Sequence, residues 1–168
     1  NGKSFTGEDE SLPYGSDWLC HYAETKAIAE KEVLEANGKD GLATTALRPH
    51  LVWGKGDPHL LPRVIERAKL GKLRMVGGGS NLVDISHVQN VAEAHLLALD
   101  ALMANRANGK AYFISLGQPV VLWEWLNNIL TRLQIPPVSR KISPRKAYVI
   151  GAILEKLWTL LNLPGEPP

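Results

Sequence analysis

Strand-like and helix-like segments alternate along this chain, and this alternation constrains the fold more than any other feature of the sequence. β-branched and aliphatic residues, mostly bounded by Gly or Pro, predict short strands at 42–49, 73–76, 82–85 and 110–115. Apolar residues at helical spacing predict helices at 17–37, 60–70, 88–104, 122–133 and 145–163. Strands that alternate with helices favour an α/β fold with a parallel sheet.

Composition and charge narrow the classes of function. The chain has 168 residues and 45% hydrophobic content, which suits one compact domain or slightly more. Its net charge of +2, with Lys and Arg dispersed, argues against a nucleic-acid partner. No uncharged apolar run reaches about 18 residues, so no plain membrane span is predicted. Cys20 is the single cysteine and residues 1–10 hold no apolar signal region, so a reducing, cytoplasmic location is expected.

The five histidines do not have the spacing of metal ligands, and no carboxylate recurs at ligand distance from them, so we expect no metal site. His21 is predicted to face solvent. His87 and His95 are predicted to be helix-capping and core-edge residues. His50 lies in the loop after the strand at 42–49, where we expect it to line the site passively.

Tyr22 and Lys26 form the most informative pair in the sequence. They are four residues apart, so a helix places both side chains on one face. A phenol titrates near pH 10 and is a poor base at neutral pH, whereas a nearby ammonium favours the phenolate. The pair therefore predicts proton exchange with a substrate alcohol, although the same spacing also occurs by chance with the Tyr at a core edge and the Lys in water.

Longer blocks place this pair in a wider pattern. YAETKAIAEKEVLEANG followed by TTALRPHLVWGKGD resembles the catalytic helix, the next strand and its loop in extended short-chain dehydrogenases. VGGGSNLVDISHVQNVAEAHLLAL and NGKAYFISLGQPVVLWEWLNNIL resemble the 3β-hydroxysteroid dehydrogenase/isomerase branch, including sterol-4-carboxylate 3-dehydrogenases. The blocks occur in the family's order over roughly residues 10–160, which is more specific than any single motif.

The resemblance implies a Rossmann-like fold that binds NAD or NADP, with a smaller substrate domain. It implies that Tyr22 is the catalytic Tyr and that Lys26 is its partner, which also donates to the cofactor ribose. It implies that the loop from Pro49 to Val52 lies beside the nicotinamide, with the Val52 amide meeting the carboxamide. Arg48 is expected to be an ion-pair partner within the fold and not a ligand contact.

The sequence also departs from the family. The Gly-rich phosphate turn, the acidic residue for the adenosine ribose and the catalytic Ser are not found. Gly77 to Gly79 is predicted to be a turn between short strands, and neither Ser4 nor Ser11 is assigned the serine's role. We expect the later half of such an enzyme, without the N-terminal cofactor half: residues 1–54 and 82–106 in the Rossmann-like domain, and residues 55–81 and 107–168 in the substrate domain. The strand at 44–47 would then have an open edge, which predicts self-association, for example as a homodimer.

Three functions remain open from sequence. The first is oxidation or reduction of a secondary alcohol or ketone on a sterol-like or other apolar substrate, with or without isomerase chemistry. The second is a sugar-nucleotide epimerase or dehydratase, or a dihydroflavonol-type reductase, on the same fold. The third is a truncated, non-catalytic fragment. The helix at 145–163 is expected to be a core or substrate-cleft helix, or alternatively to contact a membrane surface.

Overall fold

The computed structural model describes residues 7–18 and 20–163, and Ser4 lies outside the described residues. The chain forms two compact units that interleave along the sequence. The first unit comprises Asn1–Lys55 and Asp84–Gln118, and the second comprises Gly56–Val83 and Pro119–Pro168. Each unit is therefore built from two separate stretches of chain.

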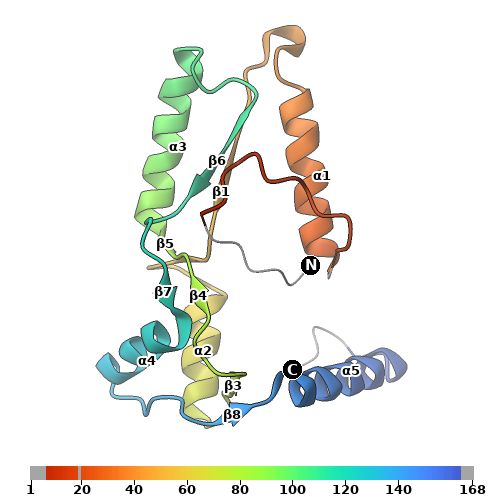
Figure 1. Cartoon of the computed structure of the whole chain (residues 1–168), viewed down its shortest axis with the longest axis vertical. Coiled ribbons are helices and arrows are strands. Elements are labelled where there is room, and N and C mark those ends of the chain that lie inside the picture. Colours follow the sequence, from red (N-terminus) through yellow and green to blue (C-terminus); the bar gives the residue numbers. More distant parts are fainter. Residues whose placement is uncertain (1–6, 19, 164–168) are drawn as a thin grey trace. The chain divides into compact units, whose positions relative to one another are not determined.

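The first unit is a small parallel sheet with helices beside it (Figure 1). Strand β1 (Thr45–Pro49) pairs in parallel with β6 (Lys110–Ile114), so that Thr45 lies opposite Lys110 and Pro49 opposite Ile114. β1 contacts both helices of the unit, α1 (His21–Glu35) and α3 (Val88–Met103). A second parallel pair, β2 (Val52–Trp53) with β5 (Ser86–His87), follows, and a short 3₁₀ turn, η1 (Lys39–Gly41), connects α1 to β1.

The second unit has its core where two helices and a loop meet. Leu130 is fully buried and packs with Ile135 and Val138, and Trp123 covers this cluster. Asn127 fixes the loop, because its side chain accepts from the N–H of Val138 (2.8 Å) and donates to the C=O of the same residue (3.1 Å). The elements of this unit are α2 (Leu60–Lys69), β3 (Met75–Val76), β4 (Leu82–Val83), β7 (Val120–Val121), α4 (Leu122–Arg132), β8 (Lys141–Ile142) and α5 (Pro144–Leu160).

The long elements agree with the sequence prediction to within a few residues at each end, apart from a later start of α1 and a shorter β1. Short pairs complete the second unit: β3 with β8 in parallel and β4 with β7 antiparallel. The strands β2, β5, β7 and β8 have two residues each and were not predicted. Residues 107–118 fall in the first unit, because β6 pairs with β1, whereas the sequence prediction grouped them with the substrate domain.

The helix α1 is not held in place by a buried apolar stripe. Tyr22 is 71% exposed, Ile28 and Val33 are also exposed, and no residue of the helix is buried. Polar contacts attach the helix to β1 instead: Asn37, just after α1, accepts from the N–H of Thr44 (2.9 Å), and Glu30 pairs with Arg48. The orientation of α1 therefore depends on charged and amide side chains.

The helix α5 is amphipathic, and most of its large apolar side chains are exposed, among them Tyr148, Ile153 and Leu160. Its start is well defined, since the hydroxyl of Ser143 accepts from the N–H of Lys146 (3.3 Å). The packing of α5 within the second unit therefore does not support its interpretation as a core helix. Within residues 7–18 and 20–163, no helix is long and apolar enough to cross a membrane.

The strand β1 pairs with β6 on one side and with no other strand among the described residues. A strand edge with unpaired N–H and C=O groups is a template for another chain. We therefore expect the 168-residue chain alone to self-associate at micromolar concentration, with the weight-average mass in sedimentation or light scattering rising with concentration. A mass that stays at 18.4 kDa across the series would contradict this prediction.

Candidate active site

Tyr22 and Lys26 lie one turn apart near the start of α1, as predicted. The Lys26 ammonium is 5.6 Å from the centre of the Tyr22 ring, within the range of a cation–π contact. Both side chains are exposed, so neither is committed to packing. Among the described residues Lys26 has no ion-pair partner. The pair therefore has a hydroxyl and an ammonium free to meet a ligand.

The loop after β1 is held in one unusual conformation. Leu51 has a φ of +34°, a value that a branched side chain rarely adopts and that persists only when the surroundings enforce it. Its carbonyl accepts from the N–H of Ser86 (3.2 Å). The hydroxyl of Ser86, a 1% exposed residue, donates to the carbonyl of Ile114 (2.8 Å), which also accepts from the N–H of His50 (3.3 Å). The loop is thus fixed to both β5 and β6.

Glycine is required where this loop ends. Gly54 has a φ of +148°, and a Cβ at this position would lie 2.6 Å from Cγ1 of Val88, the first residue of α3. The loop can therefore approach the start of α3 closely only without a side chain at residue 54. His87 occupies the N-cap of α3, where its ring nitrogen accepts from the N–H of Gln89 at 3.4 Å, which confirms its predicted capping role.

The Tyr–Lys pair and this loop lie at the same end of the first unit. Glu30 of α1 contacts Arg48 of β1, so these two residues lie at the same height along the helix and the strand. α1 and β1 run in opposite directions in Figure 1, so the start of the helix lies at the carboxyl end of the strand. One helical turn back from Glu30 is about 6 Å, and two strand residues beyond Arg48 is about 6.6 Å. Lys26 is therefore level with His50.

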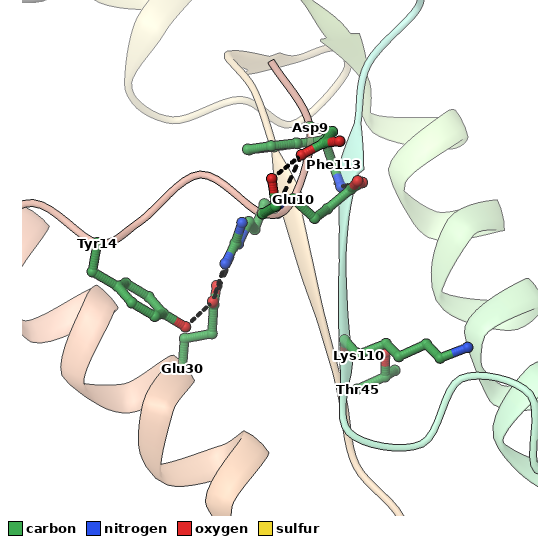
Figure 2. A network of polar contacts seen from close by, with 9 residues as sticks. Asp9, Glu10, Tyr14, Glu30, Thr45, Lys110 and Phe113 are labelled. Atoms are coloured by element: carbon green, nitrogen blue, oxygen red, sulfur yellow. Dashed lines mark hydrogen bonds and ion pairs between the residues drawn. The ribbon is translucent and has the colours of Figure 1, made fainter.

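A partly buried polar network fixes the relative position of α1 and β1. The guanidinium of Arg48 donates to Glu30 through Nε (2.9 Å) and Nη2 (2.6 Å), and the two side chains are only 19% and 15% exposed. The Tyr14 hydroxyl donates to the same carboxylate at 2.5 Å, as Figure 2 shows. The Arg48 guanidinium also lies 5.2 Å from the Phe113 ring centre. The network joins residues from the loop before α1, from α1, from β1 and from β6. It confirms the predicted ion-pair role of Arg48.

The charges in this network perturb one another. Hydrogen bonds from Arg48 hold the pKa of the Glu30 carboxyl below its usual range; burial opposes this effect and the Tyr14 hydroxyl adds to it. Burial, together with the hydrogen bond to Glu30, raises the pKa of Tyr14. At neutral pH the network therefore contains a carboxylate, a guanidinium and a neutral phenol, which is the combination that satisfies every hydrogen bond.

This assignment predicts an acid-sensitive contribution to stability. The pKa of Glu30 is lower in the folded state than in the unfolded state. The ionised carboxylate therefore stabilises the fold at a pH above the pKa of the unfolded state, and this stabilisation is lost as the pH falls through the pKa of the folded state. The difference in urea midpoint between the wild type and Glu30→Gln should therefore shrink between about pH 5 and pH 3. The same comparison in an Arg48→Met background should show little pH dependence; an equal dependence there would contradict the assignment.

The loop also presents a backbone donor of the kind that a carboxamide needs. In the parallel β2–β5 pair, the N–H of Ser86 bonds to the carbonyl of Leu51, so the ladder bonds fall on the neighbours of Val52. The N–H of Val52 consequently points away from β5. Together with the three donors of the Lys26 ammonium, this donor set fits a nicotinamide nucleoside. The described residues contain no group of three His, Cys, Asp or Glu side chains that could hold a metal ion.

Sequence reasoning missed several residues that support this site. Glu30 follows Lys26 by four residues, so it lies on the same helical face as Tyr22 and Lys26, and its spacing could have revealed it. Tyr14 lies in an aperiodic loop and Ser86 in a two-residue strand, and neither position carries a local signal. The Ser86 hydroxyl donates to a main-chain carbonyl, and the Tyr14 hydroxyl donates to a carboxylate. In both cases the tertiary fold brings donor and acceptor together.

Solved structures define the class of this fold. The dTDP-glucose 4,6-dehydratase from Bacillus anthracis, solved in complex with NAD, superposes with a TM-score of 0.62 at 23% identity. The match covers 84% of this chain and 45% of that chain. The two chains therefore share a fold, and it is of the α/β type that the alternation of strands and helices predicted.

Sequence comparison narrows the class to a family. The 3-beta hydroxysteroid dehydrogenase/isomerase family matches residues 1–143, and the chain belongs to this family. It is 54% identical over 163 residues to a 2-alkyl-3-oxoalkanoate reductase of Stenotrophomonas maltophilia, covering 96% of this chain and 49% of that protein. It is 39% identical over 151 residues to a decarboxylating sterol-4-alpha-carboxylate 3-dehydrogenase of Mus musculus, covering 88% and 42%. The chain thus spans about half the length of these relatives or less.

Proposed function

We propose that the complete protein that carries this chain is an NAD(P)-dependent oxidoreductase that interconverts a ketone and a secondary alcohol on an apolar carboxylic acid. The observation that carries the proposal is the exposed Tyr22–Lys26 pair, level with the fixed loop from Pro49 to Val52. In this proposal the first unit belongs to the cofactor domain, and the second unit contributes to the substrate domain.

The residues of the chain have distinct tasks in this reaction. The nicotinamide, when bound, supplies or accepts the hydride. In reduction, the Tyr22 hydroxyl gives its proton to the carbonyl oxygen of the substrate; in oxidation, the phenolate takes the proton of the alcohol. The Lys26 ammonium, 5.6 Å from the centre of the Tyr22 ring, donates to the ribose hydroxyls. The N–H of Val52 donates to the carboxamide, and Pro49 shapes the strand end that leads into this loop.

The names of the two relatives share one substrate chemistry. In a 2-alkyl-3-oxoalkanoate, the oxo carbon is next to the carbon that bears the carboxylate. In a sterol-4-alpha-carboxylate oxidised at position 3, the reacting carbon is likewise next to the carbon that bears the carboxylate. Both molecules are otherwise apolar. We therefore propose a 3-oxo or 3-hydroxy acid with apolar substituents as the substrate class; the bacterial relative favours an alkyl chain and the mouse relative favours a sterol as second candidate.

The alternatives from sequence have weaker support. The sugar-nucleotide interpretation is supported by solved structures at 23–28% identity, below the identity of the two sequence relatives. The relatives at 54% and 39% identity described above are each named for acting on an acid. The non-catalytic interpretation concerns the 168-residue chain by itself, which would hold the Tyr–Lys side of the site. A measurement of cofactor binding distinguishes this interpretation from the enzyme.

Turnover assays with the complete protein test the proposal. We expect oxidation of reduced nicotinamide in the presence of a 2-alkyl-3-oxoalkanoate, followed by its absorbance, and no turnover with dTDP-glucose. A sterol 4-carboxylate with oxidised cofactor tests the second candidate. Turnover of the nucleotide sugar, or of none of these compounds, would refute the proposed substrate class. Titration of NADH into the complete protein and into the 168-residue chain separates an enzyme from an inactive fragment.

A further inference from the structure

We propose that His50 binds the carboxyl group of the substrate through Nε2 and so selects acids over neutral ketones. This inference rests on the proposed function, because it assigns a residue to the substrate class given there. It replaces the passive role expected for His50 from sequence.

One ring nitrogen of His50 is committed to the protein. Nδ1 lies 2.7 Å from the main-chain carbonyl oxygen of Asp84. A carbonyl oxygen can only accept a hydrogen bond, so the proton must be on Nδ1. This bond fixes both the tautomer and the rotation of the ring. Nε2, on the opposite edge of the ring, carries a lone pair and points away from Asp84, and the residue is exposed.

The main chain of His50 is held as firmly as its ring. Its N–H donates to the carbonyl of Ile114, to which the buried hydroxyl of Ser86 also donates. The next residue, Leu51, keeps a φ of +34°. Conformations of this kind are maintained where the surroundings over-determine them, and they occur at binding and catalytic sites. Nε2 is therefore presented at a fixed place, with little conformational entropy left to lose on binding.

A carboxyl group is the partner that this nitrogen can take at this place. In a 3-oxo acid the reacting carbon and the carboxyl carbon are about 2.5 Å apart, separated by two C–C bonds. A group that binds the carboxyl must therefore lie beside the hydroxyl that protonates the ketone. The helix and strand spacings given above put His50 level with Lys26, whose ammonium lies 5.6 Å from the centre of the Tyr22 ring. One proton shared between Nε2 and a carboxyl oxygen joins the ring to the acid and leaves the Asp84 bond intact.

Two substitutions separate the roles of the ring nitrogens. His50→Asn places an amide N–H near the position of Nδ1, which retains the Asp84 bond and removes the Nε2 group. His50→Gln places an amide N–H near the position of Nε2, which retains a donor for the acid and loses the Asp84 bond. In the complete protein we expect His50→Asn to raise KM for a 2-alkyl-3-oxoalkanoate by about 10- to 100-fold, with a small change in kcat. His50→Gln should raise it much less.

The methyl ester of the same 3-oxo acid is the control substrate, because it cannot share the proton. Its KM should change much less in His50→Asn, and the wild type should prefer the acid. Equal effects on acid and ester, or a larger effect of His50→Gln accompanied by a lower Tm, would show a structural role and overturn the inference.

Binding measurements keep this test independent of turnover. A 2-alkylalkanoate without the oxo group can be titrated calorimetrically into the wild type and into His50→Asn. Weaker binding to the variant supports the carboxyl contact even if no 3-oxo acid is reduced, in which case the proposed function fails and the inference stands. Equal binding to both proteins overturns the inference, whatever the turnover assays give.

Discussion

Replacing Tyr22 with phenylalanine is expected to lower kcat of the complete protein by about 10²–10⁴-fold, the usual range for loss of a general acid–base group. The ring that faces the Lys26 ammonium remains, so the Kd for cofactor should change little. The residue is 71% exposed, so removal of its hydroxyl leaves no buried polar group without a partner and should not lower stability. Steady-state kinetics and a cofactor titration measure the two quantities separately.

Tyr148→Phe provides a matched control. Tyr148 is an exposed tyrosine on α5, in the second unit, and loses the same atom on substitution. Its kcat should stay at the wild-type value. A Tyr22→Phe protein that turns over at a near-native rate would eliminate the proton-transfer assignment, and an equal loss in both variants would point to a general effect of tyrosine removal.

Replacing Arg48 with methionine is expected to lower the free energy of unfolding by about 2–4 kcal/mol. The substitution leaves the carboxylate of Glu30 largely buried, with the Tyr14 hydroxyl as its remaining partner in the network. It also removes the cation from the faces of the Tyr14 and Phe113 rings. Urea denaturation measures the change, and Arg132→Met, at an exposed site on α4, should stay within about 0.5 kcal/mol of the wild type.

A double-mutant cycle isolates the pair from its surroundings. Glu30→Gln combined with Arg48→Met should cost less than the sum of the single substitutions, because the second change removes the charge that the first leaves unpaired. Strict additivity of the two effects would mean that the 2.6 Å contact between these side chains contributes no net coupling.

The prediction from sequence was most accurate where a pattern repeats over several turns. The helix α4 places Leu126 and Leu130 in the core, as its apolar spacing predicts, because each turn adds another residue to the same buried face. Two-residue strands have no such repeat. β5 exists because Ser86 and His87 lie opposite Val52 and Trp53, a partnership of residues more than thirty positions apart that no local window contains.

The site shows the same division between local and tertiary signals. The positions of Tyr22 and Lys26 follow from helix geometry, and the spacing alone places them on one face. The commitment of His50 Nδ1 to the carbonyl of Asp84 does not, since a main-chain acceptor 34 residues away has no sequence signature. Burial does not follow from helical spacing in α1, where no residue of the helix is buried and polar contacts of Glu30 and Asn37 attach it.

The interleaving of the two units determines the order in which the chain can assemble during synthesis. The contacts of Glu30 with Tyr14 and Arg48 span 16 and 18 residues, whereas Thr45 meets Lys110 across 65. Closing the longer loop costs about 1 kcal/mol more in chain entropy, so α1 and β1 can associate well before β6 arrives. β3 is made early but has to wait for β8, which emerges from the ribosome 66 residues later. In the later part of that interval, once β6 has been made, a nascent chain has one unit nearly complete and the other without its partner strand.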